Sequence, residues 1–438
     1  MNLSASIKKF PFSKLFVLHC LMYIGCTTGT YYYNATLTTI ASTMDGNVIL
    51  AGMLASTYSL VAMFCRPLAG FMNEKFGRRR SNEWGLYGTI LSIVLMIIAK
   101  DLWVLFVARV IAGITFSITS AANYASAADL APEDNKALGI GWFQNMATLA
   151  SYIGPAVGVW GLSQYLATGS WSAFYIVTLL TAVYSLVLNF FIRYENKPEW
   201  KAKMAAAAEA RKNKEAVVED GPKLPPMKPL FGMTVPAWLL IISLALVAMA
   251  QQSVGSFLLL SGTERGITDL GNYFLLQTVG MFICKGFIAP RIEKIGAMKV
   301  VAFAVIVAIV SYFVFSIATS VIPLLIIAPF YGCVWGTFPP VCNALIVGSV
   351  PQDRKGFASA MYLFGIDVGY GIGPTLWGVV IAMVGYARVY FVALFLPIVA
   401  MVLFLVYWKG WGKKIFDATQ EWKKQKAEKE KQPVAVEA

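Results

Sequence analysis

Twelve apolar runs of about 20 residues dominate the sequence and restrict the folds that are open to it. Hydrophobic residues make up 58% of the 438 positions and charged residues 13%, whereas a soluble domain keeps about a quarter of its residues charged. Runs of this length cross the hydrocarbon core of a bilayer, and within lipid they must be helical because a strand edge would lack backbone partners. We therefore predict an all-α polytopic membrane protein with spans at 15–38, 47–72, 82–99, 102–126, 137–163, 172–193, 235–261, 271–289, 299–319, 321–347, 356–384 and 387–408.

An internal repeat divides the chain into two halves. Several blocks return at a common offset of 219 residues without an insertion between them: Cys65-Arg66 as Cys284-Lys285, Glu74 to Gly77 as Glu293 to Gly296, Gly154-Pro155 as Gly373-Pro374, and Pro132 as Pro351. Paired halves around a central site are a plan that membrane transporters share. The repeat predicts six-helix bundles at 1–193 and 235–408, a linker at 194–234 with a polar helix at 200–220, and a basic tail at 409–438.

The basic residues indicate which side of the membrane each loop occupies. With the N-terminus inside, 30 of the 36 Lys and Arg fall in inner segments and three in outer loops. This bias predicts a multi-pass protein of the cell membrane with both termini in the cytoplasm. Topology therefore accounts for the net charge of +13 without a nucleic-acid partner. The basic tail either lies along the anionic inner leaflet or is simply soluble.

Residue types that catalysis or metal binding would require are sparse. All six Cys lie in apolar spans, which indicates packing roles and no disulfide framework. The single histidine, His19, cannot form a metal site alone and is expected to be structural. No phosphate-binding Gly-rich loop and no Ser/His/Asp set stands out. We predict a protein that is not an enzyme and that uses no cofactor or metal.

The loop between the second and third spans carries a motif that reads GFMNEKFGRRR from Gly70 to Arg80. Gly70 permits a close helix approach, Gly77 supports a tight turn, and the arginines hold the loop at the cytoplasmic surface. The motif resembles the G-x-x-x-D-x-x-G-R-R signature of the major facilitator superfamily, with Glu74 in place of Asp. The resemblance implies a fold of twelve spans and a cytoplasmic gate latch formed by Gly70, Glu74, Gly77 and Arg78.

A stripe of small residues in the fifth span is similar to a second motif of that superfamily. Gly154, Pro155 and Gly158 fit the so-called antiporter motif, G-x8-G-x3-G-P-x2-G-G, although Ala150 and Val159 depart from it. The motif is associated with drug–proton antiporters and so favours export. A pliable helix interface would need the same residues, and Gly373-Pro374 in span eleven fits that alternative. The predicted hinge residues are Gly154, Pro155, Gly158, Gly373 and Pro374.

Two charged positions differ between the repeat copies. Asp367 corresponds to Thr148 and lies about 16 Å from the inner end of its span, near the bilayer midplane. Burial there favours the neutral form, so Asp367 is predicted to carry a coupled proton. The alternatives are contact with a cationic substrate and a structural pair with a cation. Arg109, which corresponds to Ala328, is predicted to modulate the proton carrier, to bind an anionic substrate, or to snorkel at the outer rim.

Other polar residues in the spans are expected at helix ends, in a latch or along a cavity. Arg66 and Lys285 are equivalent in the two halves, which favours a snorkelling or latch role. In the superfamily the first, fourth, seventh and tenth spans line the cavity. Amides and aromatic rings there suit an amphipathic organic molecule, or they serve as interhelical glue. The predicted cavity residues are Tyr31, Tyr32, Tyr33, Asn34, Gln251, Gln252, Tyr331, Trp335 and Asn343.

These features predict a single-chain transporter of the major facilitator type. We expect a monomer that exports a small organic compound in exchange for protons, by alternating access within the lipid bilayer. One rival prediction is a proton symporter that imports an organic anion held by Arg109. Another is a membrane sensor that keeps the fold without transport.

Overall fold

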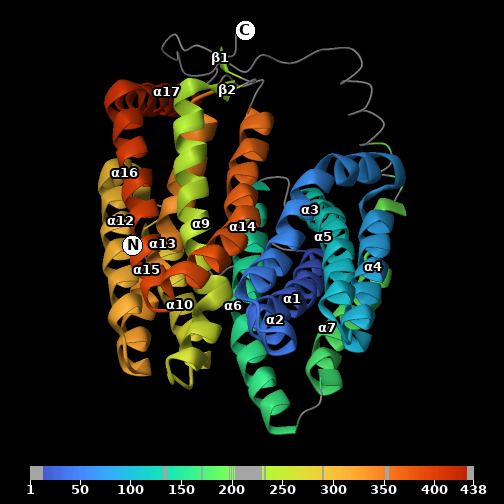
Figure 1. Ribbon diagram of the computed structural model, residues 1–438. Helices are drawn as coiled ribbons and strands as arrows, with labels where there is room; N and C mark the ends of the chain where they lie inside the picture. The colour runs from blue at the N-terminus through green and yellow to red at the C-terminus, as the bar shows by residue number, and fades with distance from the viewer. Residues whose placement is uncertain are drawn as a thin grey trace, which may run out of the picture.

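Two helical bundles stand side by side in the computed structural model, and the repeat divides the chain between them (Figure 1). The structure describes residues 13–131, 136–168, 171–196, 198, 200, 202, 229–230, 233–288, 291–350 and 355–431. Most of the predicted linker helix at 200–220 lies outside these residues, as do Pro132 and Pro351. We call the end of the bundles at which α3 finishes and α9 begins the linker end, and the opposite end the distal end.

The first half is built from helices whose ends the sequence marks locally. Its elements are α1 (Lys14–Asn34), α2 (Leu37–Asp45), α3 (Val48–Phe76), α4 (Arg78–Ile98), α5 (Leu102–Leu130), α6 (Lys136–Thr168), α7 (Trp171–Phe191) and the 3₁₀ turn η3 (Tyr194–Asn196). The side chains of Ser13, Asn47 and Asp101 accept hydrogen bonds from the first backbone N–H groups of α1, α3 and α5. Such caps satisfy donors that have no partner within the helix.

The second half repeats this order with several interrupted helices. Its elements are β1 (Pro229–Leu230), β2 (Met233–Thr234), α9 (Val235–Glu264), α10 (Gly271–Ile283), the π-helix η4 (Cys284–Ile288), α11 (Ile292–Ile295), α12 (Ala297–Ile317), α13 (Val321–Gly348), α14 (Lys355–Val384), α15 (Arg388–Ala393), α16 (Phe395–Tyr407), the π-helix η7 (Trp408–Gly412) and α17 (Lys413–Lys431). The antiparallel strands β1 and β2 form a short hairpin. This hairpin and α17 lie at the linker end (Figure 1).

Within the described residues, nine helices are individually long and apolar enough to cross a membrane. The three remaining crossings are α1 with α2, α6, and α10 with η4. The repeat is also visible in the backbone. Gly77 and Gly296 are equivalent positions, and both have positive φ angles, 85° and 95°, at the turn that follows the second span of each half. Glycine adopts this conformation without the penalty that other residues incur.

Two seams join the halves, and the repeat relates them. We name them the α3–α14 seam and the α6–α10 seam. At the distal end of the first, a Cβ on Gly52 would lie 2.4 Å from the Pro374 carbonyl oxygen. At the equivalent place in the second, a Cβ on Gly271 would lie 3.6 Å from the Val159 side chain. The distal ends of the halves are therefore in close contact.

Further hydrogen bonds hold the distal ends together. The Thr38 hydroxyl donates to the Ser256 carbonyl oxygen, and the Ser56 hydroxyl oxygen lies 2.9 Å from the Thr375 backbone nitrogen. Toward the linker end, α3 and α14 diverge (Figure 1). A Cβ added to Gly70 would meet no atom within 4 Å. The structure thus describes a conformation in which the halves meet distally and separate toward the linker end.

Candidate functional site

An ion pair between the halves lies where the α3–α14 seam opens. Arg66 Nε lies 2.6 Å from Asp367 Oδ2, and Arg66 Nη2 lies 3.0 Å from Asp367 Oδ1. Both bonds are donated by one guanidinium to one carboxylate, which is the strongest geometry for such a pair. The side chains are 32% and 14% exposed. The site is thus partly accessible and not sealed in the core.

The ion pair lies near the middle of the bundle. Arg66 precedes the end of α3 by ten residues, and Asp367 follows the start of α14 by twelve. At a rise of 1.5 Å per residue, both lie about 15–18 Å from the linker ends of their helices. The expected midplane depth of Asp367 agrees with this geometry. Of the two roles predicted for Arg66, snorkelling or a latch, its bonds to a carboxylate of the opposite half favour the latch.

Aromatic side chains surround the ion pair. Tyr31 of α1 lies within electrostatic range of Asp367, and Tyr124 of α5 lies within range of Arg66. Tyr124 is 40% exposed. One helical turn after Asp367, the Tyr370 ring stacks on Trp335 of α13 with a centroid separation of 5.8 Å. Together these residues present a charged pair bordered by rings, which suits an amphipathic organic ligand.

The second seam carries the equivalent contact without the acid. Lys285 Nζ, at the position of Arg66, donates to Thr148 Oγ1 at 2.8 Å, and Thr148 stands at the position of Asp367. The seams therefore repeat one contact between the halves, once as an ion pair and once as a neutral hydrogen bond. Lys285 donates to the opposite half, which favours the latch role over the snorkelling role for it as well.

Arg109 belongs to a separate cluster inside the first half. It is 2% exposed, and its guanidinium donates to the Leu54 and Ala55 carbonyl oxygens and to Asn34 Oδ1. The Tyr33 and Tyr58 rings lie 5.5 and 4.5 Å from its guanidinium carbon. Snorkelling at the rim is excluded by this burial. A role in proton coupling stays a prediction, and the hydrogen bonds show a side chain that holds α1, α3 and α5 together.

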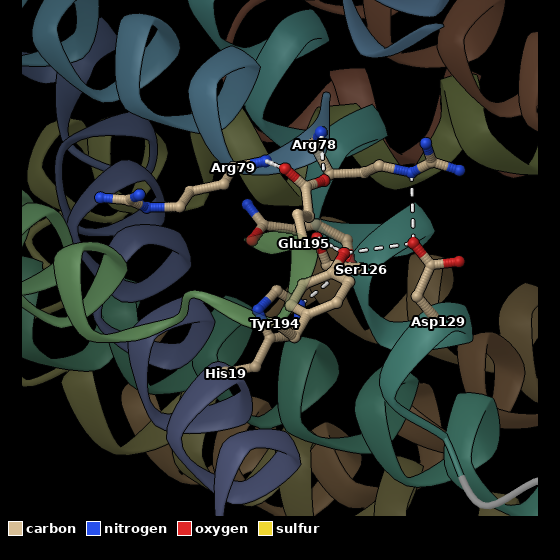
Figure 2. A network of polar contacts seen from close by, with 8 residues as sticks. His19, Arg78, Arg79, Ser126, Asp129, Tyr194 and Glu195 are labelled. Carbon is tan, nitrogen blue, oxygen red and sulfur yellow. Dashed lines mark hydrogen bonds and ion pairs between the residues drawn. The ribbon is translucent and has the colours of Figure 1, made fainter. Parts of the chain in front are cut away.

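The predicted latch is tied to an acid that the motif does not contain. Glu195, in η3, accepts hydrogen bonds from the backbone nitrogens of Arg78 at 2.7 Å and Arg79 at 3.4 Å (Figure 2). It thereby caps the first turn of α4, where a negative charge is favourable. A Cβ on Gly77 would lie 2.8 Å from Glu195 Oε2. Gly77 is therefore required both for the turn and for this cap.

A second acid holds the side chain of Arg78. Arg78 Nε lies 3.2 Å from Asp129 Oδ2, and the Tyr194 hydroxyl donates to the same carboxylate at 3.1 Å (Figure 2). These bonds connect η3, α4 and α5 at the linker end. Glu74 is exposed in this conformation, and Gly70 makes none of the close helix contacts that were expected of it.

The predicted hinge glycines are sites of close helix packing. A Cβ on Gly154 would lie 2.7 Å from the Thr28 carbonyl oxygen, and one on Gly158 would lie 2.1 Å from the Tyr32 carbonyl oxygen. In the second half, a Cβ on Gly373 would lie 2.8 Å from Gln252 Cβ. Pro155 and Pro374 lie inside α6 and α14. The contacts agree with the structural alternative, and bending at these residues stays a prediction.

The predicted cavity residues do not form one group. Tyr32, Tyr33 and Tyr331 are 1–2% exposed and lie in the cores of their own halves, so the structure places them away from the ion pair. The Tyr331 hydroxyl lies 2.8 Å from the Tyr312 hydroxyl. Half-buried members of the set are Tyr31, Asn34, Gln251, Gln252, Trp335 and Asn343. Of these, Tyr31 interacts electrostatically with Asp367, and Trp335 stacks on Tyr370, one helical turn after Asp367.

His19 has a structural environment. Its Nε2 lies 3.0 Å from the Asn123 carbonyl oxygen, and its ring stacks on Phe143. No group of three or more His, Cys, Asp and Glu that could hold a metal occurs in the part of the chain that the structure describes.

Two bundles joined across a partly buried ion pair have the architecture of a membrane transporter. The sequence pattern of the Major Facilitator Superfamily matches residues 19–341 and 268–436. Since this match spans more than half of the sequence, the chain belongs to that superfamily. It is a multi-pass membrane protein of twelve helices and a secondary transporter, not an enzyme. The predicted fold class and family are thereby confirmed.

The chain is also similar to individual members of known function and to solved structures. It is 30% identical over 142 residues to the tetracycline resistance protein, class B, of Escherichia coli, a match over 32% of this chain and 34% of that protein. It is 20% identical over 417 residues to the staphylopine export protein of Staphylococcus aureus (strain Mu50 / ATCC 700699), covering 90% and 95%. The crystal structure of the human organic anion transporter MFSD10 (TETRAN) matches with a TM-score of 0.62 and 17% identity over 89% of this chain and 98% of that one. A POT family transporter in complex with a thioalcohol conjugated peptide matches with a TM-score of 0.71 and 13% identity, over 91% and 96%.

Proposed function

We propose that the protein exports a small organic compound in exchange for protons, and that Asp367 carries the coupled proton. The observation that supports this proposal is the Arg66–Asp367 pair, which joins the halves near the middle of the bundle. A carboxylate that gains a proton there loses its attraction for the guanidinium. The charge on one group therefore changes how strongly the two halves are held together.

If the ion pair forms in only one conformation of the two halves, protonation of Asp367 changes the relative free energies of the two conformations. Proton binding is then coupled to the movement of the halves. Removing one partner of a fully buried ion pair costs about 3–5 kcal/mol, because the other charge is left uncompensated. The partial exposure of Arg66 reduces this cost here. Protonation of Asp367 avoids part of this cost by neutralising the acid. One proton that crosses 100 mV releases about 2.3 kcal/mol, which is enough to drive useful accumulation.

The positions of the bonds suggest a sequence of states. With the linker end in the cytoplasm, as the positive charges predict, the described conformation is open inward and its Asp367 is ionised and paired. The substrate enters this state. After it leaves on the outer side, a proton loads Asp367, so that the acid is uncharged while it is unpaired and the halves return. Loss of that proton inside then restores the ion pair, which favours the inward-open conformation.

Export is favoured over import by two further observations. The stripe around Gly154-Pro155 is similar to an exporter motif, from which Ala150 and Val159 depart, and a relative matched over 95% of its length is named for staphylopine export. The rival importer requires Arg109 to bind an organic anion, but that guanidinium already donates to Asn34, Leu54 and Ala55. We assign the protein to the cell membrane as a monomer with cytoplasmic termini.

Flux measurements in proteoliposomes test this function. The purified protein is reconstituted and screened under an imposed pH gradient against a panel of small organic cations, anions and zwitterions. Asp367→Asn should abolish the pH-driven component and retain exchange of a compound down its own gradient. Asp45→Asn, which alters an exposed carboxyl in α2, is the matched control. Unchanged pH-driven flux in Asp367→Asn would refute the assignment, and no flux with any compound would favour the sensor.

A further inference from the structure

The α6–α10 seam presents a cation whose repeat counterpart is paired with an acid. Arg66 has Asp367 as its partner, whereas Lys285 has Thr148. Among the residues that the structure describes, no carboxylate lies within 4.0 Å of Lys285 Nζ. The positive charge at this depth therefore lacks the counterion that its counterpart possesses.

The local chemistry leaves Lys285 able to bind an additional acceptor. The Thr148 hydroxyl donates its proton to the Gln144 carbonyl oxygen at 2.8 Å, so its lone pairs accept the bond from Lys285. An ammonium group has three N–H donors. Thr148 occupies one of them, and Lys285 is only partly buried. Two donors remain for a ligand.

The backbone at Lys285 also departs from the repeat. Lys285 lies in the π-helix Cys284–Ile288, whereas Arg66 lies within the α-helix Val48–Phe76. Single-turn π-helices are rare, and they occur frequently at functional sites. A Cβ on the next residue, Gly286, would meet no atom within 4 Å. The α6–α10 seam thus differs from the α3–α14 seam in two ways: its cation has no acidic partner among the described residues, and the backbone at that cation is a π-helix.

We propose that Lys285, with Thr148, binds an anionic group such as a carboxylate of the transported compound. This inference rests on the proposed transport function and specifies its substrate class. The substrate anion takes the place that Asp367 occupies in the first seam. When substrate is bound, both seams contain a neutralised cation, and the compound is an organic anion or a zwitterion.

Substitutions at Thr148 provide a direct test. Thr148→Asp places a carboxylate opposite Lys285, as Asp367 is placed opposite Arg66, and should exclude the substrate anion. Thr148→Asn has the same size without the charge and is its matched control. Lys285→Met removes the cation, and Lys285→Arg retains it.

Binding is measured at equilibrium with the purified full-length protein in lipid nanodiscs, without a pH gradient. The probes are 2-naphthoate, indole-3-acetate and 4-phenylbenzoate, each compared with its carboxamide. We expect at least one carboxylate to bind the wild type at least tenfold more tightly than its carboxamide. Thr148→Asp and Lys285→Met should abolish this preference, while Thr148→Asn and Lys285→Arg should keep most of it.

Two results would overturn the proposal. One is a wild type that prefers none of the three carboxylates to its carboxamide. The other is equal preference in Thr148→Asp and Thr148→Asn. Since the measurement uses no gradient, a carboxylate preference that depends on Lys285 can be found even if proton-driven flux fails, and the two proposals are thus separable.

Discussion

Removing either charge of the Arg66–Asp367 pair is expected to shift the protein away from the conformation that is open at the linker end. The pair spans the halves with bonds of 2.6 and 3.0 Å. Opposite unit charges about 4 Å apart attract by about 4 kcal/mol at an effective dielectric constant of 20. The Arg66 side chain is 32% exposed, and screening by solvent reduces this value. We therefore expect a coupling of roughly 2 kcal/mol, which is a change of about 30-fold in an equilibrium constant.

Pulsed electron spin resonance can measure this shift as a change in distance between the halves. Labels on unnatural amino acids at positions 70 and 357 avoid the six native cysteines. Both positions are exposed on the linker-end segments of α3 and α14. Asp367→Asn and Arg66→Gln should each reduce the population with a long distance, and the double variant should show little further change. Asp45→Asn should leave the distribution unchanged.

The same distance measurement at low pH tests the ion pair independently. Protonation of Asp367 removes its charge, so the wild type at low pH should come to resemble Asp367→Asn. The double variant should show no such response. Additive effects of the two single substitutions, or a coupling below about 0.5 kcal/mol, would contradict the reasoning, because neighbouring charges that interact must give a non-additive cycle.

Three further comparisons have expected outcomes. Gly77→Ala and Gly296→Ala should each lower thermal stability by about 1–3 kcal/mol because of their φ angles of 85° and 95°. Gly77→Ala should cost more, because only its Cβ would lie 2.8 Å from Glu195 Oε2; equal values would refute the clash with the Glu195 cap. Gly158→Ala should prevent correct folding, as judged by size-exclusion chromatography, whereas Gly70→Ala should be tolerated. Arg109→Lys should destabilise the protein by about 2 kcal/mol in thermal unfolding, because an ammonium cannot reproduce the fork of three acceptors, and should leave carboxylate binding unchanged.

The fold could be predicted from the sequence, because each segment that crosses lipid must form its backbone hydrogen bonds internally and is therefore helical. Apolar runs therefore predicted the spans. The motif predicted a tight turn at Gly77, and the structure has the equivalent turn at its repeat counterpart, Gly296. The comparison of repeat copies also identified Asp367 as a special position. Its depth followed from helix geometry alone.

The partner of Asp367 was harder to predict than its depth. Arg66 is 301 residues away. Because its repeat counterpart Lys285 is also a cation, the repeat favoured a shared snorkelling or latch role and did not indicate a pair with Asp367. The signal was available in principle, because a buried acid requires a cation at the same depth. Arg66 lies at that depth on a different helix, but nothing local to either segment shows that α3 and α14 are neighbours.

Two other contacts escaped prediction for related reasons. Glu195 follows the sixth span and lies outside the loop motif, so its role depends on where the chain returns after α7. Tyr32 and Tyr331 were assigned to a cavity from their helices alone. Their helices are apolar on nearly all sides, and such a sequence does not indicate which face meets a neighbouring helix.

The close distal contact between Gly52 and Pro374 has a geometrical consequence for the ion pair. Arg66 follows Gly52 by 14 residues, which places it about 21 Å along the helix from that contact. If the halves rotate about the distal contact by about 15°, as subunits do in other switching proteins, Arg66 is displaced by about 5 Å. The linker end of α3, about 36 Å from Gly52, moves by about 9 Å. A rotation that only opens the passage at one surface is therefore already large enough to make or break the bond between the two charges.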